Sequence, residues 1–219
     1  MDKLYPLQDD VLKVLSELNL DFYLTGGTVL GRFLLNHRYS DDLDFFMNNN
    51  AGFATQQSKA FSELSRHFEI ELNNEQERFA RFFINRSDIK LKVEWVNDVS
   101  FHAGDFTANE LYPKLDGFRN ILSNKICALT RNAAKDYADL LFLSYNFAFN
   151  WELIINDVME KDTYMREEKA NEFLCTFNPE EFSKVVWAIQ PDIDRYAKDL
   201  ITIAKDILLG NDNSLYNRK

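Results

Sequence analysis

Two aspartates stand two residues apart in a short, largely apolar run, Asp42-Leu43-Asp44-Phe45-Phe46. Residues two apart on a strand leave the same face, so both carboxylates would lie side by side while Leu43 points into a core. Adjacent carboxylates repel one another unless a cation lies between them, and oxygen ligands with room for phosphate oxygens suit Mg²⁺ or Mn²⁺. An isolated Asp-x-Asp pair, however, is more often a solvated acidic end of a strand.

Glu94 supplies a third carboxylate that changes this balance. The run from Ile89 to Val96 alternates between an apolar face and a polar face that carries Lys90, Lys92 and Glu94. A third carboxylate from a neighbouring strand would complete a site for one or two divalent ions, which hold a reacting phosphate and activate a hydroxyl. The alternative is that this polar face is only the solvated side of an edge strand.

The Gly26-Gly27-Thr28 turn adds a candidate phosphate site. Glycine lets the backbone approach a ligand closely, and free N–H groups at the start of a helix favour phosphate. Thr28 could cap that helix or hydrogen-bond a phosphate oxygen. A bare Gly-Gly before a helix is usually only a tight turn, and the order of the features is more specific: strand, Gly-Gly-Thr, helix, Arg38-x-Ser40, and Asp-x-Asp on the next strand.

Hydrophobic periodicity predicts the elements that position these residues. Helices are expected over 8–18, 28–37 and 53–68, and strands over 22–24, 42–46, 69–72, 78–84 and 89–96. From about Asn120 onward the sequence predicts almost only helix, with Pro179 and Pro191 in the first turns of new helices. We therefore expect a mixed α/β domain over residues 1–115 and a helical domain over residues 116–219.

Composition limits the classes of function. The 219 residues carry a formal net charge of −10, which argues against a long nucleic-acid footprint but leaves room for a local basic pocket. There is no signal peptide pattern and no apolar run of about 18 residues, so a cytoplasmic protein without a membrane span is expected. Cys127 and Cys175 lie in apolar helical patterns and are expected to be buried and reduced. The three histidines show no ligand spacing, and none is assigned a role.

These pieces together resemble a known group of enzymes. The stretch Phe22 to Leu30, with the Gly-Gly-Thr turn, followed by His37-Arg38-Tyr39-Ser40-Asp41-Asp42-Leu43-Asp44, resembles the first motif of the polymerase-β-like nucleotidyltransferases, and specifically the AbiEii/AbiGii toxin branch. Lys92-Val93-Glu94 resembles the second motif, with Glu where related enzymes can have Asp. The segment from Asn120 to Leu140 resembles the later Lys…Arg…Lys/Arg-Asp-x-x-Asp-Leu motifs. The ordered pieces cover roughly residues 20 to 145.

The resemblance implies an α+β fold: a polymerase-β-like nucleotidyltransferase core, with a small mixed sheet flanked by helices, followed by a C-terminal helical bundle. It implies that Asp42, Asp44 and Glu94 hold Mg²⁺ (or Mn²⁺) against a nucleoside triphosphate, and that Glu94 could also take the proton of the acceptor hydroxyl. The implied phosphate ligands are Gly26, Gly27, Thr28 and Ser40.

The resemblance also implies roles for the cations and the late carboxylates. Arg38, Lys92 and Lys125 would form a local positive lining, with Lys125 neutralising triphosphate charge. Asp136 or Asp139 would position Lys125 or the acceptor. For Asp139 an alternative stays open, because Lys135 lies four residues before it and could form a surface ion pair with it.

The acceptor of the transferred nucleotide is open at this point. The resemblance favours a toxin-like enzyme that adds nucleotides to an RNA end such as that of tRNA, paired with an antitoxin protein. The acidic net charge favours a small hydroxylated acceptor, such as an aminoglycoside or a lincosamide. A third hypothesis is a catalytically silent nucleotide-binding module, which the intact Asp42, Asp44 and Glu94 argue against.

Overall fold

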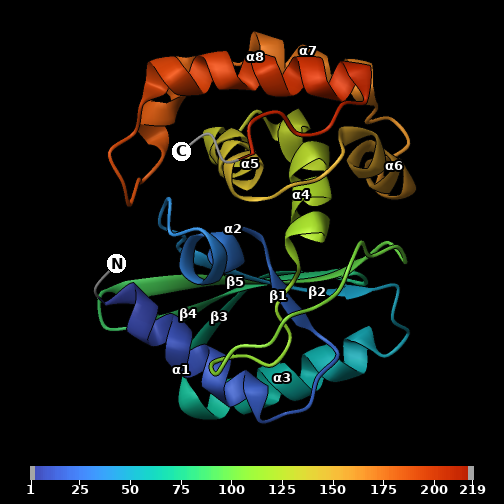
Figure 1. The fold of residues 1–219 in the computed structure, drawn as a ribbon. Coiled ribbons are helices and arrows are strands. Elements are labelled where there is room, and N and C mark those ends of the chain that lie inside the picture. Colours follow the sequence, from blue (N-terminus) through green and yellow to red (C-terminus); the bar gives the residue numbers. More distant parts are fainter. Residues whose placement is uncertain (1–2, 217–219) are drawn as a thin grey trace. The chain divides into compact units, whose positions relative to one another are not determined.

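The computed structural model describes residues 3–216 and divides them into two compact units (Figure 1). The first unit consists of residues 3–33 and 39–117, and the second of residues 34–38 and 118–216. The first unit contains a mixed sheet flanked by helices, and the second is helical. The predicted α+β class is confirmed.

The sheet of the first unit has five strands in the order β1-β2-β5-β4-β3. β2 and β5 run parallel, whereas the other neighbouring pairs are antiparallel. The strands are β1 (Tyr23–Thr25), β2 (Asp42–Asn48), β3 (Glu69–Gln76), β4 (Phe79–Arg86) and β5 (Ile89–Asp98). Each predicted strand is present, and β3 continues four residues beyond its predicted end at Leu72.

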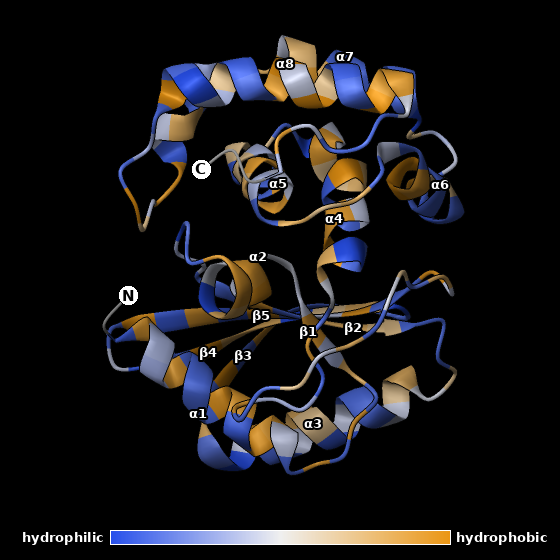
Figure 2. Ribbon diagram, in the orientation of Figure 1, coloured by the Kyte–Doolittle hydropathy of each residue, from blue (hydrophilic) through white to orange (hydrophobic). Residues whose placement is uncertain are grey.

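One face of the sheet forms the core of this unit, covered by α1 (Leu4–Ser16) and α3 (Phe53–His67) (Figure 1). The alternation in β2 and β5 buries Leu43, Val93 and Trp95 on this face. Trp95 contacts the Phe82 ring at 4.6 Å between centroids. Along both helices, bands of hydrophobic residues alternate with hydrophilic ones, as expected for helices with one buried side (Figure 2).

The outer edge of β1 is covered by the segment that leads to the second unit. Leu24 N donates to Lys114 O, and Asp116 N donates to Leu24 O, each at 2.9 Å. The Asp116 carboxylate is fully buried, where it accepts hydrogen bonds from the Thr25 hydroxyl (2.5 Å) and from the His102 ring (3.0 Å). The short strand β1 is thereby held on both sides, which sets the start of the Gly-Gly-Thr turn.

The helix after this turn is shorter than predicted. It consists of α2 (Gly26–Thr28) and the π-helical segment η1 (Val29–Leu34), whereas the sequence predicted a helix up to His37. Asn36 has a φ of +52°, a left-handed conformation that ends a right-handed helix. Residues 34–38 then belong to the second unit, where contacts distant in sequence replace helical hydrogen bonds.

The second unit is built from five α-helices and two 3₁₀ segments, among which α7 packs against α8 (Figure 1). These elements are α4 (Phe118–Cys127), η2 (Ala128–Arg131), α5 (Ala134–Asn146), α6 (Trp151–Lys161), α7 (Glu167–Thr176), η3 (Pro179–Lys184) and α8 (Ile193–Leu209). None of the helices within residues 3–216 is long and apolar enough to cross a membrane.

Two details of the second unit differ from the sequence predictions. Pro179 does open a helical segment, but Pro191 lies before the N-cap residue Asp192 of α8 rather than in its first turn. Cys127 is half-buried and Cys175 is exposed, and both are free thiols. The prediction that both cysteines are buried is wrong, because Cys175 lies on the solvent side of α7.

Truncation of Leu43 tests how strongly the first unit depends on its core. Leu43 is fully buried between the two aspartates of β2. We expect Leu43→Ala to lower the free energy of unfolding by about 2–5 kcal/mol, since a buried Leu→Ala change removes packing and leaves a cavity. Denaturant titration followed by circular dichroism would measure this loss. Leu72→Ala, at a half-exposed position of β3, is the control and should cost much less. Equal losses would contradict the assigned core face.

Candidate functional site

Carboxylates from two parallel strands lie side by side on the sheet face opposite the core. The register pairs Asp42 of β2 with Lys92 of β5, and Asp44 with Glu94. Side chains in register on neighbouring strands share a face, so Asp42, Asp44, Lys92 and Glu94 form one patch, here named the carboxylate row. The structure therefore places the three carboxylates that the sequence selected on one face of the sheet.

The Gly-Gly-Thr turn meets the carboxylate row at Asp44. Thr25, the last residue of β1, pairs with Asp44, and Gly26 follows with a φ of +71°. A Cβ atom on Gly26 would lie 2.8 Å from Asp44 Oδ2, closer than such contacts occur. Glycine is required here both for the left-handed backbone and for the close approach of the Asp44 carboxylate.

Thr28 and Ser40 hold the start of β2. The Thr28 hydroxyl donates to the backbone carbonyl of Asp42 at 2.5 Å, and the Ser40 hydroxyl donates to Asp42 Oδ1 at 3.2 Å. Both side chains are buried. Their hydroxyl protons are therefore engaged in positioning Asp42, and the Gln8 amide adds a hydrogen bond to the Ser40 carbonyl at 3.2 Å.

Two basic side chains contact the carboxylates of this row: Lys92, which belongs to it, and Arg81 of β4. Lys92 Nζ lies 2.9 Å from Asp42 Oδ2 and 3.4 Å from Glu94 Oε1. Burial opposes the charge of Lys92, but the neighbouring Asp42, Asp44 and Glu94 raise its pKa above the ordinary value. On β4, directly opposite Glu94, Arg81 donates from Nε to Glu94 Oε1 at 2.6 Å. Sequence analysis placed Arg81 on a strand but assigned it no role, because only the pairing of β4 with β5 brings it to Glu94.

The donor set of the carboxylate row fits a hard divalent cation. Carboxylate oxygens from two adjacent strands converge on one face, and an ammonium group already lies between two of them. Within residues 3–216, however, the present side-chain positions bring no three His, Cys, Asp or Glu residues close enough to hold a metal ion together. Glu94 Oε1 is occupied by Arg81 Nε at 2.6 Å and by Lys92 Nζ at 3.4 Å.

A second cluster of charges lies inside the helical unit around Asp139. This carboxylate on α5 is fully buried and accepts two hydrogen bonds from Arg38, both at 2.7 Å. Lys125 Nζ of α4 lies 2.6 Å from Asp139 Oδ2. Burial alone would raise the pKa of Asp139, but Arg38, Lys125 and the hydrogen bond from His37 hold it well below the ordinary value.

Asp136 completes this second cluster. Lys125 Nζ lies 2.8 Å from Asp136 Oδ1, and Arg131 Nη2 lies 2.9 Å from Asp136 Oδ2. Burial disfavours the charge on Lys125, but Asp139 and Asp136 raise its pKa. The suggested surface ion pair between Lys135 and Asp139 is wrong, because Asp139 is buried and bound to other cations. Both late carboxylates contact Lys125 in this structure.

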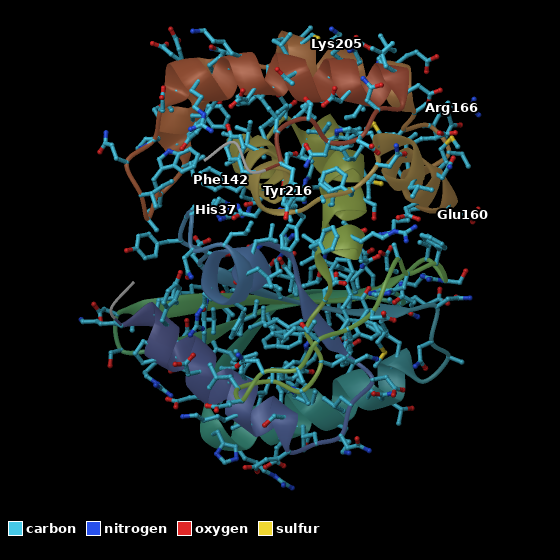
Figure 3. All side chains as sticks on the ribbon, in the orientation of Figure 1. His37, Phe142, Glu160, Arg166, Lys205 and Tyr216 are labelled. Carbon is cyan, nitrogen blue, oxygen red and sulfur yellow. The ribbon has the colours of Figure 1, made fainter. Side chains whose placement is uncertain are left out.

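His37, to which the sequence analysis gave no role, belongs to the same cluster. Its ring nitrogen Nε2 lies 2.8 Å from Asp139 Oδ1 and donates a proton, since the ionised carboxylate can only accept. The ring stacks on Phe142 at 4.7 Å between centroids (Figure 3). Burial lowers the pKa of His37 against the opposing effect of Asp139, so the ring stays neutral near pH 7. No motif spacing could have revealed it, because Asp139 lies 102 residues away in sequence.

The selected residues thus fall into two groups. In the first unit the carboxylate row, Gly26, Gly27, Thr28 and Ser40 lie together at the ends of β1 and β2. In the second unit Arg38, Lys125, Asp136 and Asp139 form one buried ionic cluster. Arg38 is a member of the second group although it lies only four residues before Asp42, because residues 34–38 belong to the helical unit.

Comparison with known proteins gives a family match and two similar folds. The model of the AbiEii family, described as nucleotidyl transferase toxins of type IV toxin–antitoxin systems, matches residues 10–206. The structure of JHP933 from Helicobacter pylori is similar, with 18% identity, a TM-score of 0.63, and coverage of 94% of this chain and 90% of that chain. An H. pylori protein described as a candidate nucleotidyltransferase is similar at 17% identity and a TM-score of 0.62, covering 94% and 93% of the two chains. These likenesses show a shared fold. No curated protein sequence matches the chain.

The depressed pKa of His37 gives a pH prediction. Above pH 6.5 His37 is neutral in both the folded and unfolded states, so its protonation does not change the free energy of unfolding. As pH falls below 6.5, His37 becomes protonated in the unfolded chain. In the folded protein it stays neutral until the pH reaches its lower pKa. Stability should fall there by up to about 1.4 kcal/mol per pH unit. His37→Gln should flatten this part of the profile, measured by denaturant titration between pH 8 and pH 5. The exposed His67→Gln should retain it, and an unchanged profile in His37→Gln would contradict the assignment.

Proposed function

The chain belongs to the AbiEii nucleotidyl transferase toxin family, and we propose that this nucleotidyltransferase moves a nucleoside monophosphate from a nucleoside triphosphate to an acceptor hydroxyl, with release of pyrophosphate. The reaction would depend on Mg²⁺ or Mn²⁺, and the acceptor would be an RNA end such as that of tRNA. The main support is the parallel register of β2 and β5, which lines up Asp42, Asp44 and Glu94 beside the Gly26 turn.

In this proposal the carboxylate row is the metal site. Asp42, Asp44 and Glu94 would hold Mg²⁺, which when bound neutralises phosphate charge and favours in-line attack at the α-phosphorus. Ser40 and Thr28 orient Asp42 through its side chain and its carbonyl. Glu94 would accept the proton of the acceptor hydroxyl, and its contact with Arg81 sets where its carboxylate lies.

The remaining residues would bind and position the substrates. Gly26, Gly27, Thr28 and Ser40 would receive the phosphates, since the turn begins a helix and follows Thr25, which pairs with Asp44. The proposal assigns the neutralisation of triphosphate charge to Lys92. Arg38 and Lys125, for which the motif resemblance suggests the same role, would first have to leave Asp139 and Asp136, which they contact inside the helical unit. Asp136 would position Lys125, in keeping with their 2.8 Å contact. Catalysis then rests on placement and charge stabilisation, which is what phosphate transfer chiefly needs.

Family membership supports the toxin-like role, and the proposal therefore includes an antitoxin protein as partner and the cytoplasm, with its nucleoside triphosphates, as location. The second candidate is transfer to a small hydroxylated acceptor such as an aminoglycoside or a lincosamide. The net charge of −10 favours it, because an acidic surface repels a long polyanion. A catalytically silent module is disfavoured, since all three carboxylates are present.

Label transfer separates these alternatives. Full-length protein would be incubated with each α-labelled nucleoside triphosphate, Mg²⁺ and total RNA, and in parallel with a panel of aminoglycosides and lincosamides. We expect label in RNA; label in an antibiotic would support the second candidate. No label in any acceptor with Mg²⁺ or Mn²⁺, together with a melting temperature raised by ATP, would indicate a silent nucleotide-binding module. No label and a melting temperature unchanged by Mg²⁺ and ATP would contradict the nucleotide site itself.

Asp44→Asn tests the metal role in the same assay. We expect transfer to fall by about 100-fold or more, since a charged ligand needed for charge stabilisation is lost. Asp41→Asn is the matched control, because Asp41 is exposed and lies just before the carboxylate row. It should transfer label at the wild-type rate. Equal activity of Asp44→Asn and wild type would rule out the carboxylate row as the catalytic centre.

Gly26→Ala tests the close approach of the turn. The added Cβ would push Asp44 out of place, and a displacement of about 1 Å can reduce turnover by about 100-fold. Gly210→Ala is matched for backbone strain, because Gly210 has a φ of +63° and lies at the end of α8 in the helical unit. Both variants should lose comparable thermal stability, but only Gly26→Ala should lose kcat. A parallel loss of kcat in both would show that strain alone is responsible.

A further inference from the structure

We infer that Lys92 is the resident counter-ion of the carboxylate row, and that a divalent cation exchanges with its ammonium group, which then becomes available to the triphosphate. This inference rests on the proposed function, because it takes the carboxylate row as the metal site. It adds an order of events: the metal binds first, and Lys92 contributes to nucleotide binding only afterwards.

The ammonium group of Lys92 occupies the position between carboxylates of two strands. Its Nζ atom lies 2.9 Å from Asp42 Oδ2 and 3.4 Å from Glu94 Oε1. A cation bound by the same two carboxylates would lie close to this ammonium, and two positive charges at such a separation repel each other strongly in a half-buried site. Lys92 and the metal therefore compete for the same oxygens.

Negative charge exceeds positive charge among these side chains. Three carboxylates, Asp42, Asp44 and Glu94, are accompanied by two basic side chains, Lys92 and Arg81. Arg81 contacts Glu94 from the β4 side, in register across the antiparallel pair, so it can remain when a metal binds. A divalent cation exchanged for the single charge of Lys92 would more than restore the neutralisation of Asp42 and Asp44.

The Lys92 side chain can move more easily than the carboxylate it contacts. A lysine ammonium is a compact charge on a flexible four-carbon stem, and it can change partners without a change in the backbone. The Lys92 side chain is 32% exposed, whereas the Asp42 side chain is 7% exposed. Lys92 therefore has room to turn away while Asp42 stays fixed by Ser40 and by the Thr28 contact to its carbonyl.

Metal binding to the full-length protein without nucleotide tests the exchange. Mn²⁺ and Mg²⁺ affinities would be measured by titration calorimetry for wild type, Lys92→Gln and Lys92→Arg. We expect Lys92→Gln to bind Mn²⁺ about ten-fold more tightly, because no ammonium must be displaced, a gain equivalent to about 1.4 kcal/mol. Its melting temperature should be lower than that of wild type without metal and should rise more when metal is added. Lys92→Arg, which keeps the charge, should not bind Mn²⁺ more tightly than wild type.

Lys90→Gln is the matched control. Lys90 lies on the same face of β5, two residues before Lys92, but pairs with Glu71 at 2.7 Å and contacts no member of the carboxylate row. Its removal should leave Mn²⁺ affinity unchanged. With Mn²⁺ present, Lys92→Gln should bind ATP about ten-fold more weakly than Lys90→Gln, whereas without metal the two variants should not differ.

The outcomes separate this inference from the proposed function. If wild type binds Mn²⁺ and Lys92→Gln binds it equally or more weakly, the exchange is wrong while the metal site stands. If neither protein binds Mn²⁺ or Mg²⁺, both the exchange and the proposed function fail. Equal tightening in Lys90→Gln and Lys92→Gln would show a general effect of surface charge and would also overturn the exchange.

Discussion

The parallel pairing of β2 with β5 is the constraint on which the candidate site depends. Parallel neighbours need a long connection, and here α3, β3 and β4 lie between the two strands in sequence. The register places Asp42 beside Lys92 and Asp44 beside Glu94, while Leu43 and Val93 fill the core on the other face. A shift of one residue would turn the carboxylates inward and the apolar side chains outward. The hydrophobic core thus selects the register, and the register assembles the charged patch.

A buried anion in the helical unit imposes the second constraint. Asp139 binds Arg38 through two hydrogen bonds and also contacts His37 and Lys125. Loss of one partner from such a buried cluster typically costs about 3–5 kcal/mol, because a charge is left uncompensated. Asp42 lies only four residues after Arg38. The segment that leads into β2 therefore starts from a residue whose side chain is bound to Asp139.

The sequence predicted those features that depend on local periodicity. Alternation revealed β2 and β5, the shared face of Asp42 and Asp44, and the polar position of Glu94. It could not reveal contacts that depend on which strands become neighbours, and Arg81 meets Glu94 only because β4 pairs with β5. The role of His37 was missed for a similar reason, since its contact with Asp139 joins residues 102 positions apart in the sequence. The helix after Gly26 ends early because tertiary contacts of residues 34–38 outweigh their helical composition.

The distribution of basic residues bears on what such a protein can bind. Arg38 and Lys125, which the motif pattern suggests as phosphate ligands, are largely committed to Asp139 and Asp136, and burial makes them costly to release. Lys92 and Arg81 instead lie on a half-exposed sheet face, where changing partners costs less. A net charge of −10 leaves little attraction for distant phosphates. Affinity for an RNA acceptor would then depend on a few phosphates or bases at the chain end, and affinity for the triphosphate on the carboxylate row with its metal and Lys92.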